Sequence, residues 1–296
     1  MGIKKNKLVI GLLCYVMWGA LPVYWNLLAG LNPLFILCCR IVFALVFTIS
    51  VLLISGRIQV FRDTLKDKAS MRYLVPSAVL ITFNWGLYIW AVNSEHILDS
   101  SLGYYMNPLI AFLLGVIMFR EKYTKLQLVA VAFAFIGVLI SVVAYGSFPY
   151  ISLGLALSFA LYGALKKKAH ADPVSGIAVE TLIILPFTII FALIFLTDSI
   201  KSAGIADLML LIGGGAVTAI PLILYSSAVN DIPFIIIGFL QYVSPSIALI
   251  YGLISGERLS TSQIVSFIFI GLGLVVFSIA LVRQSKTSPV FPESGR

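Results

Sequence analysis

The chain has 296 residues, of which 60% are hydrophobic and 11% are charged. Soluble domains are about 45–50% apolar and about 25% charged, so this composition leaves too few polar side chains to cover a water-facing surface. It excludes an ordinary soluble enzyme, a disulfide-built secreted domain and a disordered chain. The sequence therefore predicts a polytopic membrane protein embedded in a lipid bilayer.

A helix needs about 20 apolar residues to cross a bilayer core of about 30 Å. Ten runs of suitable length are separated by short breaks with turn or charge signals, at residues 8–28, 33–55, 73–93, 99–119, 126–146, 149–165, 174–196, 207–229, 233–255 and 261–282. These runs take up most of the chain and leave no room for a soluble module. We predict an all-α integral membrane fold with ten transmembrane helices.

Basic residues are distributed unequally between the two sets of connecting loops. With the N-terminus inside, 17 lysines and arginines fall on the cytoplasmic side, and only Lys201 and Arg258 fall outside. Since cytoplasmic loops carry the excess of basic residues, both termini are predicted to face the cytoplasm. The bias also accounts for the net charge of +8 without a nucleic-acid partner. We interpret the run Lys166-Lys167-Lys168 as a topology anchor.

The two halves of the chain repeat the same patterns in the same order. Asn32-Pro33 corresponds to Asp172-Pro173, and Tyr105-Met106-Asn107-Pro108 corresponds to Tyr242-Val243-Ser244-Pro245. Further matches join Gly115 with Gly252, Glu121 with Glu257, and Gly137 with Gly273. Many matches in one order indicate a duplication.

The duplication predicts three parts: a five-helix repeat at 1–146, a second one at 147–283, and a mobile cytoplasmic tail at 284–296. Because each repeat has an odd number of helices, the second copy runs in the opposite sense across the membrane. Inverted repeats of this kind are typical of secondary transporters that work by alternating access.

Several longer strings make the chain resemble a known family. They include Asn84-Trp85-Gly86-Leu87-Tyr88-Ile89-Trp90-Ala91-Val92-Asn93, Ser100-Ser101-Leu102-Gly103-Tyr104-Tyr105-Met106-Asn107-Pro108-Leu109, and Gly238-Phe239-Leu240-Gln241-Tyr242. On these strings the sequence is similar to drug/metabolite transporters of the EamA type, within the RarD subfamily. The resemblance covers nearly the whole chain. It implies a ten-helix carrier of the plasma membrane that moves small metabolites or drugs, coupled to protons.

Arg40 and Glu180 are the two ionisable residues placed well inside predicted spans, eight residues after Asn32 and Asp172 respectively. Burying such a group costs at least about 2.5–3.5 kcal/mol on insertion scales, so each is a functional candidate by default. Arg40 is predicted to bind a substrate carboxylate through its two-pronged guanidinium. Glu180 is predicted to couple transport to protons, because removal from water favours the protonated carboxyl. The alternative is an internal charge pair that only fixes packing.

Aromatic and amide side chains make up the second candidate set for substrate binding. By the resemblance they lie in the helices around a central cavity: Trp18, Asn84, Trp85, Tyr88, Tyr105, Asn107, Tyr162, Tyr225, Gln241 and Tyr242. Rings for stacking and a few polar groups for orientation suit an amphiphilic or aromatic solute. For each residue the competing interpretation is ordinary packing, and Tyr24 with Trp25 fit an interfacial aromatic belt.

Matched prolines, Pro108 and Pro245, are candidate hinges, because proline removes a backbone hydrogen bond and can kink a helix. A static bend is the alternative. Gly213-Gly214-Gly215 is interpreted as a site of close helix packing. Gly252 and Gly256 have a small-xxx-small spacing, and we expect a monomer or a weak homodimer.

No cofactor, metal site or catalytic residue is predicted. The three cysteines lie in apolar runs and the two histidines lie in loops without a ligand at suitable spacing. The leading hypothesis is a proton-coupled secondary transporter of small molecules, and an uncoupled facilitator is the alternative within transport. An integral membrane enzyme would need a cluster of His, Asp or Glu, and a sensor would normally bring a soluble domain.

Overall fold

The computed structural model describes residues 5–94, 96–254 and 260–287, and in these ranges it consists of helices and connections without a strand. Each predicted apolar run is helical. The corresponding elements are α1 (Lys5–Asn26), α2 (Pro33–Ile54), α4 (Lys68–Asn93), α5 (Ile97–Phe119), α6 (Lys125–Tyr145), α7 (Tyr150–Ala169), α8 (Pro173–Phe195), α10 (Ile205–Asp231), α11 (Phe234–Leu240) with α12 (Val243–Ile254), and α13 (Thr261–Thr287). Two short helices, α3 (Ile58–Lys66) and α9 (Thr197–Ser202), lie in connections.

Nine segments of the described chain are long and apolar enough to cross a membrane. The helix α7 is not among them, because three lysines in its last turn lower its average hydropathy. The fold is therefore an all-α multi-pass membrane fold, as predicted, while the count of ten spans stays a prediction.

Two matched helix starts show how local sequence sets the boundaries. Asn32 accepts a hydrogen bond from the backbone N–H of Leu34 at 2.9 Å, and Asp172 accepts one from Ser175 at 3.0 Å. In both cases proline occupies the first helical position, where its missing N–H would have had no intrahelical partner. Asparagine or aspartate followed by proline thus begins α2 and α8 in the same way.

The helices of the two halves pack in corresponding pairs. The contact of α1 with α10 corresponds to that of α7 with α4, and the contact of α2 with α10 to that of α8 with α4. Likewise α1 packs against α12 as α7 packs against α5. Three further pairs, α2 with α8, α5 with α11, and α6 with α13, each join equivalent helices. Most of the larger helix contacts therefore have a counterpart in the other half, although some, such as α7 with α10 and α5 with α6, do not within the described chain.

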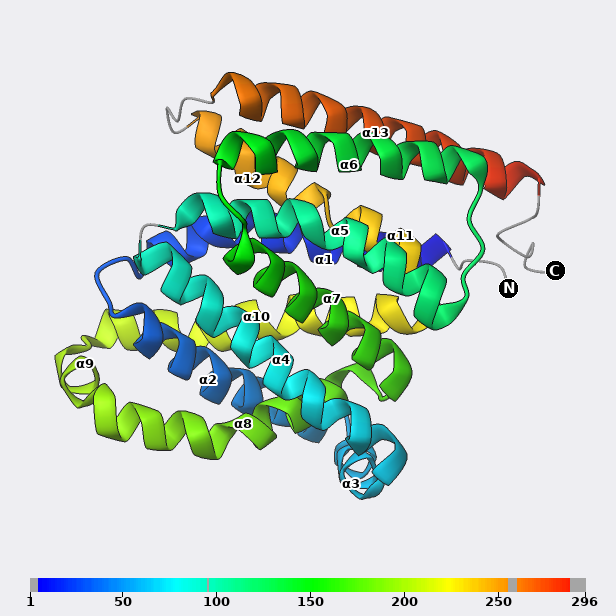
Figure 1. Ribbon diagram of the computed structural model, residues 1–296. Helices are drawn as coiled ribbons and strands as arrows, with labels where there is room; N and C mark the ends of the chain where they lie inside the picture. The colour runs from blue at the N-terminus through cyan, green and yellow to red at the C-terminus, as the bar shows by residue number, and fades with distance from the viewer. Residues whose placement is uncertain (1–4, 95, 255–259, 288–296) are drawn as a thin grey trace.

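The pair α6 and α13 lies along one side of the bundle (Figure 1). The close approach of these two helices depends on two matched glycines. A Cβ on Gly137 would lie 2.8 Å from the Ser266 carbonyl oxygen, and a Cβ on Gly273 would lie 2.9 Å from the Ala130 carbonyl oxygen. Gly215 of α10 similarly lies against the backbone of Phe43 in α2. The prediction that the triple glycine permits close packing is confirmed at Gly215.

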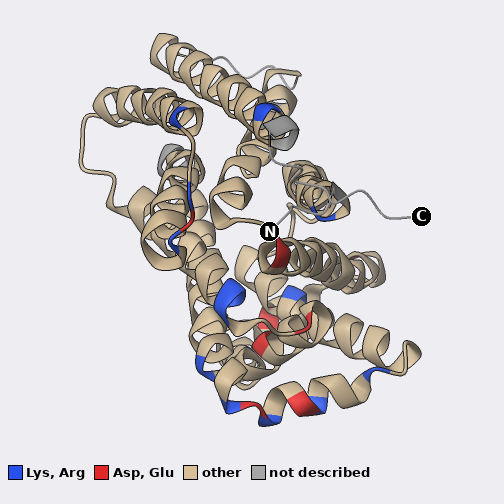
Figure 2. Cartoon of the chain, turned by 90° about the vertical axis from the view of Figure 1, so that its right-hand side faces the viewer, with Lys and Arg blue, Asp and Glu red and all other residues tan. Residues whose placement is uncertain are grey.

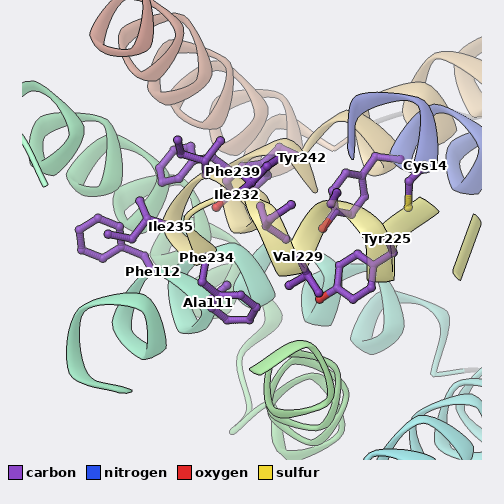
Figure 3. Close-up of a cluster of buried hydrophobic side chains, with 14 of the residues drawn as sticks. Cys14, Ala111, Phe112, Tyr225, Val229, Ile232, Phe234, Ile235, Phe239 and Tyr242 are labelled. Atoms are coloured by element: carbon purple, nitrogen blue, oxygen red, sulfur yellow. The ribbon is translucent and has the colours of Figure 1, made fainter. Parts of the chain in front are cut away.

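A central apolar cluster joins α1, α5, α10 and α11 (Figure 3). Residues drawn there include Cys14, Phe112, Tyr225, Ile235 and Phe239, all of them buried. Burial of this kind in a bilayer reflects packing between helices, since lipid tails are as apolar as the side chains. Tyr162 and Leu222 of this cluster also line the cavity described below.

The ninth predicted span, 233–255, is not one continuous helix. It is broken at Gln241 and Tyr242, between α11 and α12. Pro245 has no N–H to donate to the Gln241 carbonyl, and its ring clashes with that carbonyl. The local backbone therefore forms hydrogen bonds between residues three positions apart, as in a 3₁₀-helix, such as Ser244 N–H to Gln241 O at 3.1 Å. Pro108, its match, lies inside the continuous helix α5. The two matched prolines therefore do not produce the same local geometry.

Two other predictions fall wholly or partly on residues outside the described ranges. The expected tail at 284–296 begins within α13, which continues to Thr287, and the rest of it lies outside the described residues. Gly256 and Glu257 also lie outside the described residues.

One end of the bundle collects the charged side chains. Here α1, α8 and α11 begin and α2, α5, α7 and α10 end (Figure 1), and we call it the basic end; it faces the viewer in Figure 2. Ion pairs across it join Lys7 to Asp231 at 2.9 Å and Arg57 to Asp172 at 2.5 Å. Both pairs connect the first half of the chain to the second.

Candidate functional site

A small, partly open cavity lies where α2, α4, α7, α8 and α10 meet. Its volume is about 20 Å³, and it is lined by Ile41, Ile81, Thr82, Trp85, Tyr162, Ile177, Glu180, Thr181, Ile184 and Leu222. Such a volume holds about one water molecule, whereas ligand pockets measure about 300–1,000 Å³. The helices around it must separate before a metabolite fits.

Arg40 of α2 lies at the Trp85 side of this cavity. Its guanidinium carbon lies 4.9 Å from the Trp85 ring centroid and 4.5 Å from that of Trp25. Its Nε donates a hydrogen bond to Thr218 Oγ1 at 3.0 Å. Among the described residues no carboxylate lies within ion-pair distance of Arg40, so its other four N–H groups have no protein acceptor there. The stacked indoles stabilise the cation and leave its donors available.

Two tyrosines complete the surroundings of Arg40. The rings of Tyr88 and Tyr104 are 5.8 Å apart, and both phenols lie close enough to the guanidinium to interact with its charge. Their exposed fractions are 37% and 38%, although both lie in predicted membrane spans. Arg40, Trp25, Trp85, Tyr88 and Tyr104 are called the arginine cage below. This group combines one cation with four aromatic rings.

Glu180 of α8 lies on the other side of the cavity and is 4% exposed. Ser77 of α4 donates a hydrogen bond to its Oε1 at 2.5 Å, and the hydroxyl of Tyr162 lies 3.4 Å from its Oε2. The ammonium of Lys166 lies 3.2 Å from Oε1, and that lysine side chain is 1% exposed. The contact is an ion pair without good hydrogen-bond geometry, and Lys166 makes no other hydrogen bond within the described chain. Each of the two buried charges therefore depends on the other.

This pairing corrects the interpretation of the lysine run. We interpreted Lys166 as part of a topology anchor, but it is buried beside Glu180. The physical reason is helical spacing, because Lys166 follows Tyr162 by four residues and so shares its inward face. Arg40 and Glu180, which occupy matched positions, do not pair with each other.

The remaining aromatic candidates fall into two groups. Trp18, Tyr162 and Tyr225 pack together between α1, α7 and α10, with the rings of Tyr162 and Tyr225 stacked 6.0 Å apart. Tyr105 and Tyr242 meet elsewhere, where the Tyr242 hydroxyl donates to the Tyr105 carbonyl at 3.1 Å. Gln241 lies buried at the break between α11 and α12. Only Tyr162 of these lines the cavity.

The two asparagines connect helices. Asn84 Nδ2 donates to the Leu155 carbonyl and to Ser158 Oγ, both at 2.9 Å. Asn107 Nδ2 donates to the Ala156 carbonyl at 2.6 Å. Both amides therefore tie α4 and α5 to α7, and the structure does not place them on the cavity.

Sequence reasoning missed four residues near the two charged candidates: Trp25, Lys166 and Ser77, which contact them, and Tyr104, which interacts with the charge of Arg40. Trp25 follows Trp18 by seven residues and so shares a helix face with it, which could have identified Trp25. We assigned Trp25 to an aromatic belt at the membrane interface instead. Tyr104 differs from the selected Tyr105 by one position, or about 100° around a helix. Ser77 gave no signal, because serine at any inward helical position looks alike.

The chain is similar to the EamA-like transporter family over residues 6–143 and again over 149–279. It is 37% identical to the uncharacterized transporter YojE of Bacillus subtilis, covering 96% of this chain and 97% of that protein. It is 33% identical to the protein RarD of Escherichia coli K12, covering 96% and 98%. A solved crystal structure at 15% identity aligns with a TM-score of 0.73 over 95% of this chain and 99% of that one, which supports the fold alone.

Proposed function

Because the chain belongs to the EamA-like transporter family and is a multi-pass membrane transporter of small molecules, we propose that it is a proton-coupled secondary carrier. Its substrates are small amphiphilic or aromatic metabolites or drugs with an anionic group. The observation that carries this proposal is the pair of unlike charges beside one cavity. Arg40 has free donors in an aromatic surrounding, and Glu180 is a buried carboxyl that can exist with or without a proton.

Arg40 supplies the substrate-binding charge in this proposal. An arginine in hydrocarbon without an acidic partner is costly, and a bound carboxylate satisfies two of its N–H groups at once. The ring of a substrate then stacks in the arginine cage, where Tyr88 and Tyr104 are partly exposed.

Glu180 supplies the proton-coupling group. Its charged form is held by Lys166 and Ser77 in a buried site, so loss or gain of a proton changes the balance of charge inside the bundle. No other carboxyl group of the described chain lines the cavity.

The pairing of equivalent helices supports two inverted repeats and alternating access. Most of the larger helix contacts recur when the halves are exchanged, as expected for inverted repeats that open in turn toward the two sides of the membrane. The cation excess supports a cytoplasmic basic end. We place the carrier in the plasma membrane as a monomer or weak homodimer.

Reconstitution into liposomes that hold a pH-sensitive dye tests the proposal. The solutes are labelled aromatic amino acids, other amphiphilic acids and chloramphenicol, applied to the wild type, Glu180→Gln and the control Asp207→Asn, whose carboxyl does not line the cavity. We expect substrate-dependent proton movement in the wild type and the control, and its loss in Glu180→Gln. Arg40→Lys should raise the half-saturating concentration.

Each other result has a definite meaning. Solute transport without proton movement in the wild type would replace the coupled carrier with a facilitator. Proton movement retained in Glu180→Gln would remove Glu180 from the coupling path. Folded protein that moves neither solutes nor protons would contradict the proposed substrate class.

A further inference from the structure

Three consecutive lysines on the last turn of α7 have three different surroundings. Lys166 pairs with Glu180 in the interior. Lys167 donates to the carbonyls of Val229 and Ile232, at 3.0 and 2.5 Å, where α10 ends. Lys168 makes neither contact and is half-buried. One helical turn therefore holds both the partner of the proposed proton site and a contact that closes the basic end.

Glu121, which follows α5, binds the other side of the same turn. Its two oxygens accept the N–H groups of Phe234 and Ile235, at 2.6 and 2.9 Å, where α11 begins. The ammonium of Lys167 lies 3.9 Å from Glu121 Oε1. A carboxylate thus binds a helix N-terminus and an ammonium binds a helix C-terminus, as the helix dipoles favour. We call Glu121, Lys167 and the α10–α11 turn the clamp.

The local backbone fixes the carboxylate of Glu121 in this position. Arg120 takes a left-handed conformation, and Glu121 N–H returns to the Gly115 carbonyl at 3.0 Å, which closes the end of α5. Gly115 leaves room for α11, because a Cβ there would lie 2.7 Å from Ile235 Cγ1. The clamp therefore connects α5 of the first half to α7, α10 and α11 of the second.

The groups around Glu180 come from every helix packed on it. Lys166 and Tyr162 on α7 are the titratable groups that face it, and α4 contributes the Ser77 hydroxyl. Beside it, α2 and α10 line the cavity with Ile41 and Leu222. In the described chain, Lys166 is thus the one cation that responds directly to the charge of Glu180.

We propose that Lys166 and Lys167 couple protonation of Glu180 to opening of the clamp at the basic end. The proposal rests on the proposed function, because it uses Glu180 as the proton-binding group. A proton on Glu180 leaves Lys166 as an uncompensated buried charge, which is strongly unfavourable. The ammonium reaches water when the last turn of α7 moves outward. Lys167 lies on that turn, so its contacts with α10 and Glu121 break in the same movement.

The native thiol of Cys14 reports on this opening without any substrate. A Cβ on Gly11 would lie 3.3 Å from Ala228 Cβ and 3.7 Å from Ile232 Cδ1, next to the clamp. Cys14 lies about one turn further into the bundle and is 0% exposed. In a Cys38→Ala/Cys39→Ala background, Cys14 is the single thiol.

The experiment measures labelling of Cys14 in inverted membrane vesicles with a charged, membrane-impermeant methanethiosulfonate across a pH series. Each rate is divided by that of the denatured protein at the same pH, which removes the intrinsic reactivity of the thiol. The variants are Lys166→Met, Lys167→Met, Glu180→Gln and the matched control Lys168→Met. Glu121→Gln is a second clamp variant, and cooperative melting confirms folding in each case.

We expect labelling to rise as the pH falls in the wild type and in Lys168→Met. Lys167→Met and Glu180→Gln should label at least about tenfold faster than the wild type at neutral pH, the factor that corresponds to loss of about one charge-assisted hydrogen bond. Labelling in Glu180→Gln and Lys166→Met should not depend on pH. Lys167→Arg should restore the wild-type rate.

Two results in the variants would overturn the inference. In the first, Lys167→Met and Glu121→Gln are both folded and their Cys14 is labelled at the same rate as in Lys168→Met. The clamp would then be a static helix cap. The other is a pH dependence that persists in Glu180→Gln. Proton-coupled transport in liposomes with pH-independent labelling would reject this inference alone. The expected labelling without any proton-coupled transport would reject the proposed function and leave a pH-operated gate.

Discussion

Replacing Lys166 with methionine removes the partner of Glu180 and keeps a long unbranched side chain in the same space. The two side chains are 1% and 4% exposed, so neither charge is screened by water. Removing one member of such a pair costs about 3–5 kcal/mol, because the other charge stays buried without compensation. Glu180 retains the Ser77 hydrogen bond and can accept a proton, which places the expected loss near the lower limit, about 3 kcal/mol. The loss should be smaller at acidic pH, where protonation neutralises Glu180.

A double-mutant cycle separates the pair from the volume change. Lys166→Met combined with Glu180→Gln leaves no charge to bury, so the double variant should be more stable than Lys166→Met alone, with a coupling of about 2 kcal/mol or more. The free energy of unfolding is measured in mixed micelles from the loss of helicity with denaturing detergent. Additive losses, or a loss under about 1 kcal/mol in Lys166→Met, would show that the ion pair does not hold the two charges in the folded bundle.

Three further outcomes follow from contacts described above. Asn84→Ala should lower the free energy of unfolding by about 1–3 kcal/mol, because two buried hydrogen bonds are lost, to Ser158 Oγ and to the Leu155 carbonyl, at about 0.5–1.5 kcal/mol each; the same micelle titration measures it. Trp85→Leu should weaken solute binding by about 0.5–2 kcal/mol through loss of the ring over Arg40, measured as a dissociation constant, and unchanged affinity would exclude the cage as the site. Hydrogen bonds from the first turn of α4 hold the pKa of Asp67 below its ordinary value. Its stabilising effect is therefore present above the ordinary aspartate pKa and is lost as the pH falls through the lowered one, so Asp67→Asn should melt with a weaker dependence on acidic pH.

Much of the fold could be predicted because membrane helices are recognised by the composition and length of their apolar runs. The apolar runs, the Asn-Pro and Asp-Pro starts and the family strings all pointed to helices that the structure contains. The break at Gln241 and Tyr242 was harder to foresee. Pro108 and Pro245 occupy matched positions, yet only one interrupts its helix, so the outcome depends on tertiary packing and not on proline alone.

The candidate site was only partly predictable, since residue type does not show which way a side chain points. Arg40, Trp85 and Tyr88 lie in one group, as the shared helix face of the last two suggested. The burial of Lys166 could not be recognised from the sequence, because a run of lysines at a helix end is usually solvated. Its burial depends on a carboxyl group on another helix, and no single-helix pattern contains that information.

The glycine-lined crossing of α6 and α13 has a mechanical consequence. These helices end the two halves of the chain, and Gly137 and Gly273 let their backbones meet almost without side chains between them. Sliding or tilting there would open a gap that no nearby side chain fills. In the proposed alternating-access carrier the crossing would therefore serve as a pivot, with the smallest displacement beside α6 and α13 and a larger one toward the opposite side of the bundle.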